Sequence, residues 1–116
     1  MQGHQVIEGL ISGKLHGFAE TRKGKNDSSY AVAKVLAAPH DGEPLFVNVI
    51  AFVPDACAAL MALSDGDAVA IAGSLTPKVW TDKQGNTKPA LDMIAQQVMT
   101  VYHAGAKGLA MSEVQG

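Results

Sequence analysis

The stretch DAVAIAGSLTPKVW, residues 67–80, alternates between apolar and small or polar side chains. Val69, Ile71 and Leu75 share one parity, and Gly73 lies between them on the same parity. Alternation with a period of two is typical of a strand that buries one face. A glycine on the inward face indicates a tightly coiled strand in which a side chain is left out. This segment therefore predicts a strongly curved strand on a small core.

Four other segments also alternate, the last of them irregularly after Ala95, and the first repeats the inward glycines at Gly9 and Gly13. Turn-forming residues flank the second of these segments. The turn before it is ETRKGKNDSS (20–29), and the turn after it is PHDGEP (39–44). The four predicted strands cover residues 6–16, 30–37, 45–53 and 89–102.

The segment LFVNVIAFV, residues 45–53, has apolar side chains on both faces, so periodicity alone leaves its orientation open. We expect the smaller set, from Val47 to Val53, to pack inside a narrow barrel. Phe46 and Phe52 then face outward.

Between the third and fourth strands the period changes. PDACAALMALSDGD begins with Pro54 and Asp55, is rich in alanine and leucine, and ends near Gly66, which predicts a helix of about ten residues. The order is three strands, one helix and two strands. In a chain of this size, it predicts an all-β fold: a closed five-stranded OB-fold barrel with the helix at its base.

The composition predicts one domain, residues 1–102, followed by a flexible tail rich in glycine and alanine, residues 103–116. No apolar run approaches the roughly 20 residues that span a bilayer, and residues 1–9 lack a signal-peptide layout. Cys57 is the only cysteine, which fits a reducing compartment. We therefore expect a cytoplasmic protein without membrane contact.

The net charge of −2 argues against a general polyanion binder, but the charge is unevenly distributed. Residues 14–34 sum to +3 and residues 76–88 to +2. Local sign matters more than the total for a ligand that touches one face. The positive segments are candidate phosphate contacts, although solvated turns account for such clusters equally well.

Three stretches resemble the bacterial single-stranded DNA-binding proteins: VIEGLISG (6–13), LFVNVIAF (45–52), and GDAVAIAGSL with the following KVWTDKQGN (66–86). The pattern G-x-L-x-x-x-x-W-T-D-x-x-G, from Gly73 to Gly85, is fairly specific, and the likeness extends from Val6 to Val101. It implies that Phe46, Phe52 and Trp80 stack on bases. It also implies assembly as homodimers or homotetramers, and association with the nucleoid.

Three features depart from that family's pattern. The loop between the second and third strands carries no additional tryptophan, and the chain ends in SEVQG, without the acidic tip that recruits replication proteins. The exterior of the fourth strand is small, at Ala68, Ala70, Ala72 and Ser74. Contacts with replication proteins are therefore left open.

The residues themselves also favour binding to a single strand, which needs flat aromatic platforms and a basic track for phosphates. Trp80, the only tryptophan, lies beside a Gly-Asn turn and is flanked by lysines. Burial of the phenylalanines in a subunit interface is the competing interpretation. The candidate nucleic-acid contacts are Trp80, Phe46, Phe52, Tyr30, Lys78, Lys83, Lys34, Lys14, Arg22 and Lys88.

Catalytic and metal-binding patterns are missing from the sequence. The four histidines have no ligand spacing, and nothing resembles a phosphate-binding loop or a nucleophile elbow. We therefore expect no enzyme activity, metal or cofactor. The leading hypothesis is a protein that coats single-stranded DNA in replication, recombination or repair. The alternative is a primosome-type adaptor that acts through protein contacts, since the chain is acidic overall.

Overall fold

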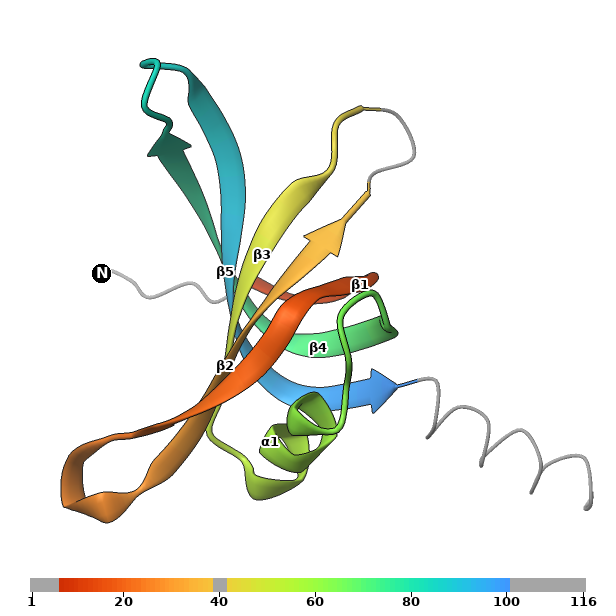
Figure 1. Cartoon of the computed structure of the whole chain (residues 1–116), viewed down its shortest axis with the longest axis vertical. Helices are drawn as coiled ribbons and strands as arrows, with labels where there is room; N and C mark the ends of the chain where they lie inside the picture. Colours follow the sequence, from red (N-terminus) through yellow and green to blue (C-terminus); the bar gives the residue numbers. More distant parts are fainter. Residues whose placement is uncertain (1–6, 39–41, 101–116) are drawn as a thin grey trace, which may run out of the picture.

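Five strands and one short helix make up the computed structural model, which describes residues 7–38 and 42–100 (Figure 1). A single 3-10 turn, Lys25–Asp27, joins the first two strands. The elements are β1 (Ile7–Lys23), β2 (Ser29–Ala37), β3 (Leu45–Ala51), α1 (Pro54–Met61), β4 (Ala68–Thr81) and β5 (Thr87–Thr100). The predicted all-β fold, with a helix between the third and fourth strands, is confirmed.

The strands close into a barrel in the order β1-β2-β3-β5-β4, because β4 also pairs with β1. The β3–β5 pair is parallel and the other four pairs are antiparallel. Closure removes the free sheet edges that would otherwise invite aggregation. The predicted OB-fold barrel is therefore present.

The core is filled by the inward residues of all five strands and by one face of α1, where Leu60 is fully buried. The predicted inward set is confirmed for Val47, Val49 and Ala51. The prediction was wrong for Val53, which is 44% exposed, because β3 ends at Ala51 and Val53 is the N-cap of α1.

Gly73 and Gly13 lie where two backbones approach each other closely. A β-carbon on Gly73 would overlap the carbonyl oxygen of Ile94, and one on Gly13 would overlap that of Leu36. Ordinary residues therefore do not fit at these points, which confirms why glycine falls on the inward parity of both strands.

The first strand is longer than predicted, because it continues past His16 through a bulge and pairs with β2 as far as Lys23. Gly17 lies in the bulge with φ +75°, and its N–H donates a 2.7 Å hydrogen bond to the Asp65 carboxylate. Only residues 24–28 form the turn. The interpretation of residues 20–23 as turn was wrong, since the bulge lets these polar residues continue the ladder.

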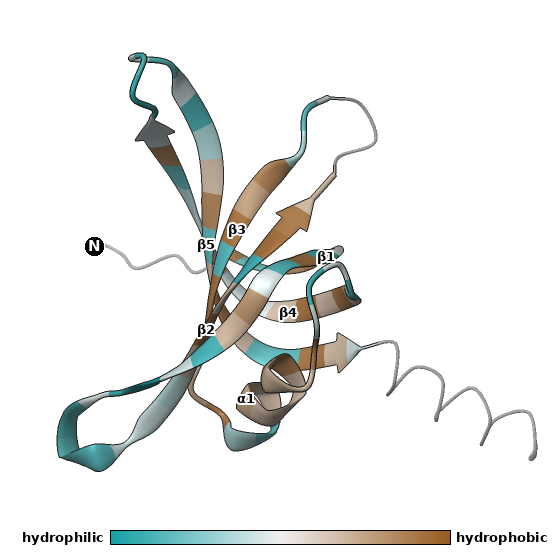
Figure 2. Cartoon of the chain, in the orientation of Figure 1, coloured by the Kyte–Doolittle hydropathy of each residue, from teal (hydrophilic) through white to brown (hydrophobic). Residues whose placement is uncertain are grey.

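Two hairpin arms extend beyond the barrel, one formed by β1 and β2 and the other by β4 and β5 (Figure 1). Figure 2 shows hydrophilic residues toward both arm tips and hydrophobic residues on the barrel strands. In the part of the chain that is described, no helix has the length and hydrophobicity to cross a membrane. The predicted tail, residues 103–116, lies outside the described residues.

Candidate nucleic-acid interface

The outward side chains of β2 and β3, with Phe52 just after β3, form a continuous surface that we call the β2–β3 outer face. The residues that alternate with these side chains along β2 and β3 point inward and are buried, so the side chains of this face point outward. Cross-strand pairs align Leu36 with Phe46, Lys34 with Asn48, and Val32 with Ile50. The members are Tyr30, Val32, Lys34, Leu36, Phe46, Asn48, Ile50 and Phe52.

One end of this face carries an aromatic pair. The rings of Tyr30 and Phe52 lie 5.7 Å apart between centroids at 43°, and Phe52 is 57% exposed. Arg22 lies directly across from Tyr30 on β1 and forms a 3.3 Å ion pair with Glu20. Arg22 is therefore on a strand beside the aromatic pair, and its predicted place on a loop was wrong.

The opposite end carries a second pair, between His16 of β1 and Phe46 of β3. Their ring centroids lie 5.2 Å apart, with the rings nearly perpendicular at 75°. His16 is not among the contacts predicted from the sequence, although it shares the outward parity of Lys14. Lys14 is exposed and lies opposite Leu36, which in turn lies opposite Phe46.

A row of polar residues begins at His16, passes between Phe46 and the Tyr30–Phe52 pair, and crosses all five strands. The pairing order is His16, Lys34, Asn48, Asp92 and Thr76. The Asn48 side-chain amide donates a 3.2 Å hydrogen bond to Asp92. Sequence reasoning did not single out Asn48 and Asp92, although a lone amide in an apolar strand was an available signal.

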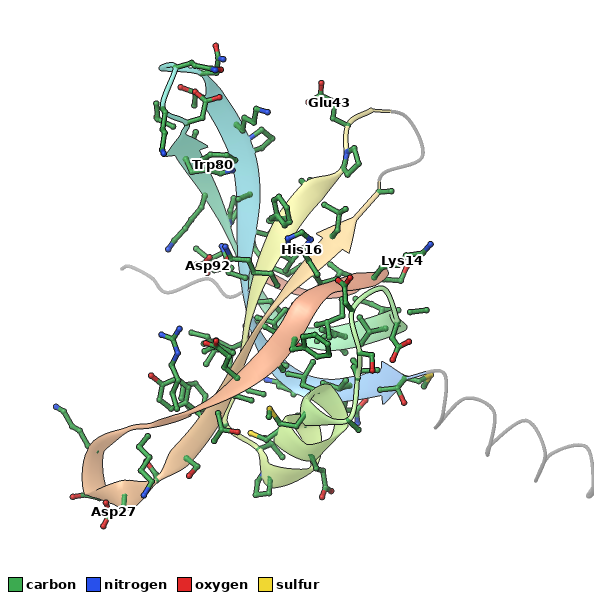
Figure 3. All side chains as sticks on the ribbon, in the orientation of Figure 1. Lys14, His16, Asp27, Glu43, Trp80 and Asp92 are labelled. Carbon is green, nitrogen blue, oxygen red and sulfur yellow. The ribbon has the colours of Figure 1, made fainter. Side chains whose placement is uncertain are left out.

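The β4–β5 arm carries the tryptophan (Figure 3). Trp80 is 42% exposed and pairs directly with Lys88, and Lys78 lies two residues before it on the same parity. Lys78 forms a 2.5 Å ion pair with Asp92, which joins the arm to the polar row. Four predicted contacts, Trp80, Lys78, Lys83 and Lys88, are thus gathered on this arm.

Asp82 holds the turn of the arm in place. Its carboxylate accepts hydrogen bonds from the backbone N–H groups of Asn86, at 2.8 Å, and Gln84, at 2.9 Å. The bond from Asn86 is the main reason that the pKa of Asp82 is below the ordinary value of an aspartate. Lys83 lies within this turn and is exposed.

One further exposed ring was not recognised in the sequence. Phe18 lies in the β1 bulge, between His16 and Glu20, and is 69% exposed. Leu15 and Ala19, on the opposite parity, are buried, so Phe18 faces outward. Its outward parity, shared with His16, was an available signal, because residues 15–20 keep alternating between buried or half-buried and exposed positions through the bulge.

The described residues, 7–38 and 42–100, hold no group of three or more histidine, cysteine or acidic side chains that could bind a metal ion. Cys57 is half-buried, and its thiol donates to the carbonyl of Ala51 at 3.0 Å. Cys57 packs against the core.

The fold and the site together define an OB-fold barrel with aromatic rings and lysines on its outer surface, a class that binds nucleic acid. The chain belongs to the single-strand binding protein family, whose sequence model matches residues 7–101. Members of this family bind single-stranded DNA and form oligomers. The resemblance seen in the sequence is therefore confirmed.

Solved structures share the fold. The small single-stranded DNA-binding protein from Streptomyces coelicolor superposes with a TM-score of 0.66 at 19% identity, covering 84% of this chain and 95% of that chain. The mitochondrial single-stranded DNA-binding protein Rim1 from S. cerevisiae has a TM-score of 0.59 at 14% identity, covering 84% and 97%. No curated protein matches the chain significantly.

Proposed function

We propose that this protein binds single-stranded DNA without strong sequence preference, as a non-enzymatic coating protein in replication, recombination or repair. Bases stack on Phe46, Phe52 and Trp80, with Tyr30 supporting Phe52. Every base has a flat face, so stacking tolerates any sequence. Arg22 is the only arginine, which leaves little capacity for bidentate reading of guanine.

The observation that carries this proposal is the spacing of aromatic rings along one connected surface. The His16–Phe46 and Tyr30–Phe52 pairs lie at opposite ends of the β2–β3 outer face. The ion pair and hydrogen bond at Asp92 connect that face to the arm that carries Trp80. Each stacked base contributes on the order of 1–3 kcal/mol, so three platforms support a useful affinity.

The phosphate contacts that we propose come from residues around these rings. Lys34 lies at the centre of the face, Lys83 and Lys88 on the arm, and Arg22 and Lys14 beside the two aromatic pairs. Lys78 is a further candidate on the arm, where its ammonium is paired with Asp92. Such contacts release counterions, so the affinity falls as salt is raised.

Anisotropy of fluorescently labelled oligo-dT, oligo-dC and a DNA duplex, measured at low and high salt, tests the proposal. We expect both single strands to bind with similar affinity, the duplex to bind much more weakly, and the affinity to fall with salt. A preference for the duplex, or no binding of either single strand at low salt, would contradict it.

We also propose that the protein assembles as a homodimer or homotetramer and acts in the cytoplasm at the nucleoid. The outer surface of β1 and β4 supports self-association, because Leu10 is 71% exposed and pairs with the small Ala72. The same surface favours a second candidate, an adaptor that works through protein contacts. An adaptor would recover a replication protein in a pull-down without binding oligo-dT at low salt.

A further inference from the structure

We infer that Asp92 restrains DNA binding by holding the Lys78 ammonium in an ion pair within the interface. The inference rests on the proposed DNA-binding function and assigns a regulating role to a residue that is not itself a contact. Asp92 lies on β5, in the polar row between Asn48 of β3 and Thr76 of β4.

Both carboxylate oxygens of Asp92 are engaged. Oδ2 lies 2.5 Å from the Lys78 ammonium nitrogen, and Oδ1 accepts the 3.2 Å hydrogen bond from the Asn48 amide. Asn48 thus orients the carboxylate toward the arm. The side chains of Lys78 and Asp92 are 58% and 33% exposed, so a phosphate can reach the ammonium from solvent.

The position of the pair places it on the path of a bound strand. Lys78 precedes Trp80 by two residues on the same outward parity, so a base stacked on Trp80 brings its phosphate close to Lys78. The adjacent carboxylate repels that phosphate and partly neutralises the charge of the ammonium. Lys78 therefore adds little to the counterion release that drives binding.

Lys34 provides the contrast. It lies in the same polar row, yet it takes part in no ion pair with any residue in the described ranges, 7–38 and 42–100. Its full positive charge is available to a phosphate. Of two lysines on one surface, one is thus partly neutralised and the other is not.

The variant Asp92→Asn tests the inference, because the amide keeps the size of the carboxylate and removes its charge. We expect the affinity for oligo-dT at low salt to rise roughly two- to five-fold, the range of an exposed charge pair. The slope of log affinity against log salt should become steeper by about 0.7, which corresponds to one additional phosphate contact on a single strand.

Two further variants separate this effect from a general change in charge or structure. The double variant Lys78→Met/Asp92→Asn removes equal and opposite charges, so its salt slope should equal that of the wild type. Asp55→Asn, in the first turn of α1 at the far end of the barrel from the arm, makes the same change in total charge and should leave the slope unchanged (Figure 1). Circular dichroism shows whether each variant is folded.

The inference is overturned if Asp92→Asn leaves the salt slope unchanged, if Asp55→Asn steepens it equally, or if the double variant loses about 0.7 of the wild-type slope. A loss of affinity confined to oligo-dC would also overturn it, because the carboxylate would then be accepting hydrogen bonds from base amino groups. If Asp92→Asn does not fold, the slope of the double variant decides the question. A wild-type protein that binds no oligonucleotide would refute the proposed function itself.

Discussion

His16 and Phe46 lie edge to face across β2, with ring centroids 5.2 Å apart, although they come from strands that are not neighbours in the barrel. The residues of β2 that pair with them are Lys34 and Leu36. The histidine thus supports one side of the phenylalanine and leaves the rest of the ring for other contacts. Edge-to-face aromatic pairs stabilise by about 0.5–1.5 kcal/mol beyond their buried area.

Replacing His16 with alanine should weaken binding to oligo-dT by roughly two- to ten-fold, since Phe46 loses the ring that orients it. His16→Phe keeps an aromatic edge and should bind nearly as well as the wild type. Anisotropy titrations of both variants at one salt concentration measure the effect. Equal affinities for His16→Ala and the wild type would show that Phe46 needs no support.

The Phe52 ring is the exposed member of the pair with Tyr30. Phe52→Ala should lower the affinity for oligo-dT at least roughly five-fold, because a stacked base contributes on the order of 1–3 kcal/mol. Val53→Ala, at the exposed neighbouring position, is the matched control and should bind normally. If Phe52→Ala instead changes only the oligomeric state in light scattering, Phe52 belongs to a subunit interface.

Much of this fold could be predicted from the sequence because closure depends on local signals. Alternation predicted which residues of β2, β3 and β4 point inward. The inward glycines lie where the backbone carbonyls of Leu36 and Ile94 come close to the neighbouring strand. Val53 was misplaced because alternation cannot show where a chain leaves a sheet. The extent of β1 was missed because residues 20–23, beyond the bulge, are polar on both parities and so show no alternation.

The site was only partly predictable, for a different physical reason. Single rings such as Trp80 and Phe52 could be found from their parity. Asp92 and His16 matter through partners from other strands, and those partners depend on the register and on the parallel β3–β5 pairing. A single sequence does not encode such distances directly.

Gly73 and Gly9 pair with each other across β4 and β1, yet substitutions at the two positions should differ. Gly73→Ala should lower the free energy of unfolding by about 1–3 kcal/mol, since the new methyl group meets the backbone carbonyl of Ile94. In Gly9→Ala the new methyl group meets only the end of the Leu75 side chain, at 2.8 Å, so the loss of unfolding free energy should be smaller. Urea denaturation compares the two variants. A smaller effect at Gly73 would contradict the closeness of β4 and β5.

Acid should loosen the tip of the β4–β5 arm through Asp82. Because the pKa of Asp82 is lowered in the folded protein, its ionised form stabilises the turn above the ordinary pKa of an aspartate. That stabilisation is lost as the pH falls through the lowered pKa. Trp80 emission followed from neutral to strongly acidic pH should show this change in the wild type.

In Asp82→Ala the turn lacks its acceptor at every pH, so the acid step should be absent, while global unfolding by urea at neutral pH changes little. An identical acid step in Asp82→Ala would show that another group controls the arm.

The central claim is that Trp80 is held on the arm to stack on an unpaired base, and its own emission reports this directly because it is the only tryptophan. Oligo-dT should quench the emission saturably, at a concentration that rises with salt, and Trp80→Ala should weaken binding by roughly ten-fold or more. Unchanged emission at saturating oligo-dT, together with full affinity of Trp80→Ala, would contradict the claim.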